Sequence, residues 1–166
     1  MSSITETRQN LIGTWALVEY KVVNIETGHV TYPMGSNVQG FLMYSADGFV
    51  SANLMKPGAP AFLSEDRVRG TQEELSEAMK HYLGYCGHYD LEEANGGIMV
   101  KHNMQVCSFP NWIGHEQGRL ITFNGNILEI NTANAVNMCT GHLDGKSHSH
   151  QLAFDAWGAQ LASAVI

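Results

Sequence analysis

The sequence has little charge and no concentration of positive charge. Only 15% of its 166 residues are charged, whereas soluble globular domains average about 25%. Nine Lys and Arg stand against sixteen Asp and Glu, which gives a net charge of −7 at pH 7. Proteins that bind nucleic acids need clustered basic side chains to hold the phosphate backbone. We therefore expect no nucleic-acid partner.

Long apolar runs and paired cysteines are also missing. No run approaches the roughly eighteen apolar residues of a membrane-spanning helix, and residues 1–10 lack the apolar stretch of a signal peptide. The three cysteines form no Cys-x-x-Cys pair, which is typical of reduced thiols. From these absences we expect a soluble cytoplasmic protein with no membrane partner.

The motifs that hold the commonest cofactors are absent as well. No glycine-rich phosphate loop precedes a helix and no Gly-x-Ser-x-Gly elbow exists, so we set aside nucleotide-dependent and α/β-hydrolase chemistry. His148 and His150 would share one face of a strand. Neither a third histidine nor a carboxylate follows at the spacing of a metal site. We expect neither a metal nor an organic cofactor.

The sequence is rich in turn dipeptides that favour β-hairpins, namely Asp47-Gly48, Asn95-Gly96, Asn124-Gly125 and Asp144-Gly145. Segments rich in Val, Ile, Tyr, Phe and Thr lie between them, and they predict strands over residues 14–23, 39–44, 49–54, 84–91, 98–107, 117–123, 127–132 and 148–156. This order is typical of an all-β fold, a closed antiparallel up-and-down barrel of about eight strands. We expect one domain over residues 11–157.

One segment, residues 71–83, predicts a short amphipathic helix. Thr71 and Glu74 form a capping-box pattern. Leu75, Met79 and Tyr82 then recur at helical spacing. We expect the apolar face of this helix either to plug one end of the barrel or to pack on its wall.

The hairpin turns also predict which side chains point inward. A two-residue turn at Asn95-Gly96 sorts apolar residues onto one face and polar residues onto the other, which a one-residue slip would destroy. The inward pairs in this register are Leu91 with Val100, Tyr89 with His102, Gly87 with Met104, and Tyr85 with Val106.

The other two hairpins give a less complete result. The Asn124-Gly125 turn pairs Ile121 with Leu128 and Arg119 with Ile130, which places Arg119 inside. The Asp47-Gly48 hairpin leaves open which of its faces is buried. One face groups Phe41 and Met43 with Val50, Ala52 and Leu54, and the other groups Leu42 and Tyr44 with Phe49, Ser51 and Asn53.

The opening Leu-Ile-Gly-Thr-Trp of residues 11–15 resembles the Gly-x-Trp start of lipocalins and fatty-acid-binding proteins. A longer match is Gly-Tyr-Cys-Gly-His-Tyr at 84–89, then His102, Ser-Phe-Pro-Asn-Trp-Ile-Gly at 108–114, and Arg119. With Gly-Phe-Leu-Met-Tyr at 40–44, this looks like the lipocalin-like domain family of small bacterial and fungal proteins, over about residues 11–132. The resemblance implies a calycin-type barrel with an internal cavity. Some such barrels act in secondary-metabolite pathways as cofactor-free cyclases or isomerases on polyketide- or terpenoid-like substrates, and others only bind ligands.

Three residues are candidates for catalysis. His102 could act as general acid or base, contact a ligand without chemistry, or be a core histidine bonded to Tyr89 or to a backbone carbonyl. Arg119 could bind a carboxylate or enolate oxygen, or stack over Trp15 at the barrel end. In the catalytic interpretation, Tyr89 and Arg119 stabilise a developing oxyanion. We expect the ligand to contact Tyr85, Met104, Trp112, Tyr44, Phe41 and Leu128, although Trp112 could instead cover the core.

Taken together, these features favour a barrel that encloses a small, mostly apolar organic molecule. The first hypothesis is a cofactor-free isomerase or cyclase acting on a secondary metabolite. A non-catalytic carrier or sensor with the same pocket is the main alternative, and a protein-interaction module with a filled barrel is the third. The expected partners are the hydrophobic ligand and, as an option, a second copy of the chain in a homodimer.

Overall fold

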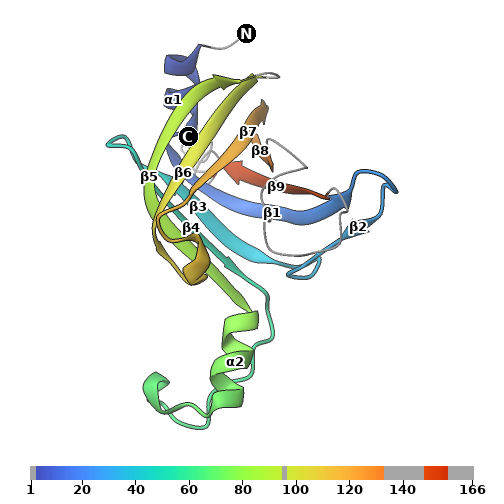
Figure 1. The fold of residues 1–166 in the computed structure, drawn as a ribbon, viewed down its shortest axis with the longest axis vertical. Coiled ribbons are helices and arrows are strands. Elements are labelled where there is room, and N and C mark those ends of the chain that lie inside the picture. The colour runs from blue at the N-terminus through green and yellow to red at the C-terminus, as the bar shows by residue number, and fades with distance from the viewer. Residues whose placement is uncertain (1–2, 95–96, 133–147, 157–166) are drawn as a thin grey trace, which may run out of the picture.

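The computed structural model describes residues 3–94, 97–132 and 148–156 (Figure 1). One continuous antiparallel sheet runs in the order β2-β1-β3-β4-β5-β6-β7-β8-β9, and β1 also pairs with β9. That last pairing closes eight strands into a barrel and leaves β2 as an extra strand beside β1, which confirms the expected fold. The elements are α1 (Ile4–Leu11), β1 (Gly13–Asn24), β2 (Val30–Thr31), β3 (Gln39–Tyr44), β4 (Phe49–Met55), η1 (Arg67–Arg69), α2 (Gln72–Lys80), β5 (Tyr82–Ala94), β6 (Gly97–Cys107), η2 (Pro110–Trp112), β7 (Glu116–Asn124), β8 (Ile127–Thr132) and β9 (His148–Ala156).

Helix α1 was not expected from the sequence, yet it belongs to the core. The side chain of Ser3 caps it by accepting a hydrogen bond from the backbone N–H of Glu6. Leu11, at its last turn, is fully buried, and its carbonyl accepts the indole N–H of Trp15 at 2.9 Å. The helix lies at the end of the barrel where β5 and β6 are joined (Figure 1).

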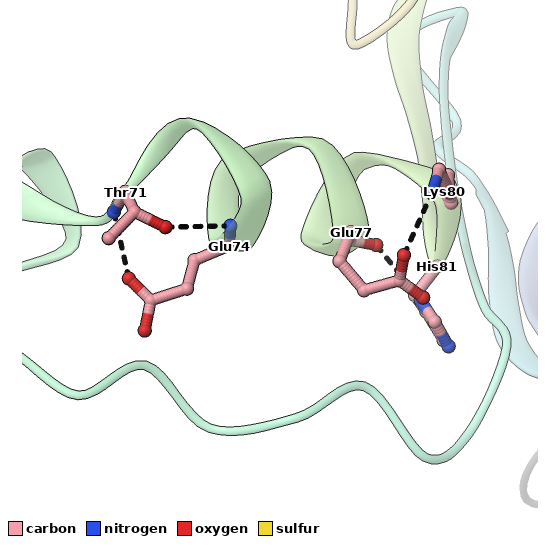
Figure 2. Close-up of polar contacts among 5 residues, drawn as sticks. All are labelled: Thr71, Glu74, Glu77, Lys80 and His81. Carbon is pink, nitrogen blue, oxygen red and sulfur yellow. Dashed lines mark hydrogen bonds and ion pairs between the residues drawn. The ribbon is translucent and has the colours of Figure 1, made fainter.

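Helix α2 forms where expected but does not plug the barrel. Figure 2 shows its capping box, in which Thr71 Oγ1 accepts the N–H of Glu74 and the Glu74 carboxylate accepts the N–H of Thr71. The helix has no buried residue and projects from the barrel (Figure 1). Leu75 and Met79 are 46% and 45% exposed, so the expected packing of its apolar face was wrong. Within the described residues, no helix is long and apolar enough to cross a membrane.

The β3–β4 hairpin sets which tyrosine enters the barrel. Tyr44 pairs with Val50, and the N–H of Ser45 donates to Phe49 O at 2.9 Å, so three residues form the loop. Gly48 has φ +91°, a left-handed conformation that suits the last position of such a loop. An odd loop length shifts the register by one residue relative to a two-residue turn and reverses one strand's faces. The sequence therefore predicted wrongly which side chains of β3 share a face with which side chains of β4.

In the observed register, the inward face of this hairpin consists of Leu42, Tyr44, Val50, Ala52 and Leu54, all buried. Phe41 lies on the outer wall and is 43% exposed. Its expected place in the barrel lining was wrong for the same reason.

The β5–β6 register agrees with expectation as far as Gly87, which pairs with Met104, and Tyr89 pairs with His102. A bulge then shifts the pairing, so that Tyr85 faces Cys107 rather than Val106, and Val106 is 63% exposed. At the bulge the backbones approach so closely that a Cβ on Gly87 would lie 1.8 Å from Asn103 O. The turn residues 95–96, and the Asp144-Gly145 dipeptide, lie outside the described part.

In the β7–β8 hairpin Arg119 pairs with Thr132 and Ile121 with Ile130, two residues away from the expected partners. Because side chains alternate with a period of two along a strand, this shift keeps Arg119 on the inward face.

Candidate functional site

His102 lies at the centre of a buried cluster built from three strands. His102 is 2% exposed, and each of its ring nitrogens meets a tyrosine hydroxyl. Nε2 lies 2.7 Å from Tyr44 Oη of β3, and Nδ1 lies 3.1 Å from Tyr85 Oη of β5. The imidazole therefore bridges two phenols whose strands lie on either side of β4.

All three groups of this cluster are held in their neutral forms. Burial, together with the nearby positive charge of Arg119, lowers the pKa of His102 to about 3. Burial raises the pKa of Tyr85 to about 12 and that of Tyr44 well above its usual value of 10. A charged imidazole or phenolate would have to give up its hydration in this interior. At neutral pH the cluster is thus a fixed set of hydrogen-bonding dipoles.

Tyr89 is inside the barrel beside this cluster, but its hydroxyl is directed elsewhere. It donates to the backbone carbonyl of Ser45 at 3.1 Å. Its ring meets that of Tyr44 edge-on, with centroids 4.9 Å apart, and the guanidinium of Arg8 from α1 lies 5.3 Å from its centroid. Tyr89 is thus His102's cross-strand neighbour, and the hydroxyls that bond His102 are those of Tyr44 and Tyr85.

Arg119 brings a positive charge to the interior from β7. Its Nη1 donates to Gly118 O at 2.9 Å and its Nη2 to Gln117 Oε1 at 3.0 Å. The charge opposes protonation of His102 and offsets part of the rise in the pKa values of Tyr44 and Tyr85. These pKa effects are those of a positive charge on the inward face of β7, where the strand register places Arg119.

The remaining predicted ligand contacts divide between the cluster and the core. Trp112 of η2 is partly buried and meets Tyr85 edge-on, with centroids 6.5 Å apart. Met104 and Leu128 are 2% and 0% exposed. The structure thus brings Tyr44 and Tyr85 together around His102, places Trp112 against Tyr85, and leaves Phe41 outside.

Among the residues that the structure describes, no three His, Cys, Asp or Glu side chains gather in the arrangement of a metal site. The side chains of His148 and His150 in β9 are not among those described.

A groove on the outer wall was missed by sequence reasoning. It crosses β4, β5 and β6 beside the bulge and has a volume of about 310 Å³. In its wall, Tyr82 Oη donates to Asn53 Oδ1 at 2.6 Å. No motif in the sequence predicts it. Its lining residues are Ser51, Asn53, Tyr82, Gly84, Tyr85, Cys86, Val106, Cys107 and Ser108.

The closed antiparallel barrel with polar groups inside has the architecture of small β-barrels that are filled by side chains or hold one small ligand. The family model for the lipocalin-like domain matches residues 12–155, so the chain belongs to the lipocalin-like domain family. The chain is 39% identical over 87 residues to a protein of Aspergillus oryzae named "4'-hydroxy-3'-methoxypropiophenone carrier protein ppsC". The match covers 50% of this chain and 78% of that protein. Among solved structures, a redesigned beta barrel is 12% identical, covering 91% of this chain and 96% of the other, with a TM-score of 0.39.

Proposed function

We propose that the barrel binds a small, mostly apolar organic molecule and carries it without converting it. The observation that carries this proposal is the state of His102, whose two ring nitrogens are both hydrogen-bonded and whose pKa is about 3. A general base works best when its pKa lies near the working pH. This imidazole is suited to holding other groups in place and poorly suited to accepting a proton.

The composition of the interior supports the same function. A few polar groups around Tyr85, His102 and Arg119 are set among buried apolar residues that come from β1 and from β3 to β9. Small-molecule sites combine mostly apolar walls with a small number of orienting polar groups. The carrier name of the related Aspergillus oryzae protein favours a carrier here as well.

The second candidate is a cofactor-free isomerase or cyclase acting on a secondary metabolite. The charge of Arg119 beside the Tyr44–His102–Tyr85 cluster favours it, because such a group stabilises a developing oxyanion. Catalysis would then rest on holding a flexible substrate in a reactive shape rather than on proton removal by His102.

A titration with an environment-sensitive hydrophobic dye tests the carrier proposal. We expect saturable binding, displacement by small aryl ketones, and chromatographic recovery of each ketone unchanged after prolonged incubation. Absence of saturable binding would contradict a ligand site. Time-dependent conversion of a bound compound would favour the enzyme instead.

A pair of adjacent substitutions locates the bound dye. Ala52 faces the interior and pairs with Tyr85, whereas Ser51 faces outward and lines the outer groove. Ala52→Leu should weaken dye binding about tenfold or more, because an added side chain excludes ligand volume worth roughly 1–3 kcal/mol. Ser51→Leu should leave affinity unchanged. The reverse pattern would place the dye in the groove and not in the barrel.

A further inference from the structure

The hydrogen bonds of His102 have a direction that the burial of its partners determines. A neutral imidazole has one nitrogen that donates and one that accepts. Tyr44 is 2% exposed, and within the described residues its hydroxyl has His102 Nε2 as its hydrogen-bonding partner. A buried hydroxyl proton without an acceptor is costly. Tyr44 therefore donates to Nε2, which leaves the proton of the ring on Nδ1.

The direction of the second hydrogen bond, between His102 and Tyr85, follows from that of the first. With its proton on Nδ1, the imidazole donates to Tyr85 Oη at 3.1 Å. Tyr85 accepts that bond and keeps its own O–H proton free to donate to a further group. In the described part of the chain, His102 is the hydrogen-bonding partner of the Tyr85 hydroxyl. Within the described residues no second hydrogen bond engages this proton, so it is available to a ligand that enters the barrel.

The surroundings of Tyr85 fit an acceptor that carries partial negative charge. The positive charge of Arg119 acts on Tyr85. The ring of Trp112 stands edge-on to the ring of Tyr85, with centroids 6.5 Å apart, and supplies an apolar surface beside that ring. An oxygen bonded to a flat apolar body would satisfy both features.

We infer that Tyr85 is the specificity-determining hydrogen-bond donor of the ligand site, that Tyr44 and His102 orient it through the directed chain Tyr44→His102→Tyr85, and that the ligand is an apolar carbonyl compound whose oxygen accepts from Tyr85. This inference rests on the proposed function. It assigns Tyr44 and His102 as positioning residues that act through Tyr85 and do not touch the ligand.

Matched ligands test the donor. The probes are phenyl ketones and the alkylbenzenes of the same length, titrated by dye displacement. Tyr85→Phe should reduce affinity for the ketone about threefold to tenfold, the effect of one hydrogen bond, and should leave the hydrocarbon unchanged. Tyr82→Phe removes a hydroxyl from the outer wall and should alter neither affinity. In infrared spectra, the carbonyl stretch of the bound ketone should move to higher frequency in Tyr85→Phe.

The positioning role has its own measurement. Nitrogen NMR of histidine-labelled protein, assigned by His102→Gln, should show His102 protonated at Nδ1. Tyr44→Phe releases Nε2 and lets Tyr85 turn its proton toward the ring, so ketone preference should fall although Tyr44 does not contact the ketone. Melting curves verify that each variant is folded.

Two failures are distinguishable. If the parent protein binds neither the ketone nor the hydrocarbon, the proposed carrier function itself is overturned. A parent that binds both equally, with a carbonyl stretch unaffected by Tyr85→Phe or with His102 protonated at Nε2, would overturn only the directed donor.

Discussion

Lowering the pH from 7 to 5 should destabilise the parent protein by about 2 kcal/mol more than a His102→Gln variant, since each pH unit below the unfolded pKa costs about 1.4 kcal/mol. In the unfolded chain His102 takes up a proton near its ordinary pKa of 6.5, whereas in the fold its pKa is about 3. Between these values the unfolded state binds more protons. Stability is therefore complete above pH 6.5 and declines as the pH falls toward 3.

The measurement is urea unfolding of both proteins at several pH values. Glutamine is uncharged and carries both a donor and an acceptor, so it can still meet Tyr44 and Tyr85. The carboxylates and the other histidines titrate in both proteins, and their effects cancel in the difference. Parallel stability curves would show that His102 titrates in the fold as it does in the unfolded chain.

The length of each turn decides whether the sequence correctly predicts which side chains face the interior. The Asn95-Gly96 hairpin sorts polar from apolar residues in one register only, and the Tyr89–His102 pair predicted from it is observed. At β3–β4 the loop holds three residues rather than two, and that single residue decides that Tyr44 enters the barrel while Phe41 leaves it. Local patterns predict the strands well because alternation is a local property, but they do not count loop residues.

The bond between Tyr44 and His102 was beyond local reasoning for a related cause. The two residues are 58 positions apart, and their strands are not neighbours in the sheet. Their contact depends on closure of the barrel, which brings side chains from distant strands into one interior. Helix α1 was missed because only Ile4 and Leu11 among its residues are apolar, although Ser3 and Glu6 have the spacing of a capped helix start.

Replacing His102 with leucine should lower the free energy of unfolding by about 2–3 kcal/mol, mainly because Tyr44 then holds a buried hydroxyl without an acceptor. Tyr85 loses the same partner at smaller cost, since it is only partly buried. Adding Tyr44→Phe to His102→Leu should then cost little, because the orphaned hydroxyl is gone. The double variant should be more stable than the sum of the single changes predicts by about 1–3 kcal/mol, the coupling expected of residues in one hydrogen-bonded network.

A second double-mutant cycle, at a pair of residues that share no partner, supplies the control for this coupling. Tyr82 donates to Asn53 on the outer wall, so Tyr82→Phe and His102→Leu share no partner and their effects should add to within about 0.5 kcal/mol. If the effects of Tyr44→Phe and His102→Leu on the free energy of unfolding were also additive, the 2.7 Å contact between Tyr44 and His102 would add nothing to the separate packing of the two side chains. Strong coupling in the first cycle and none in the second would identify the Tyr44–His102 bond as the fixed support from which the Tyr85 hydroxyl is presented to the interior.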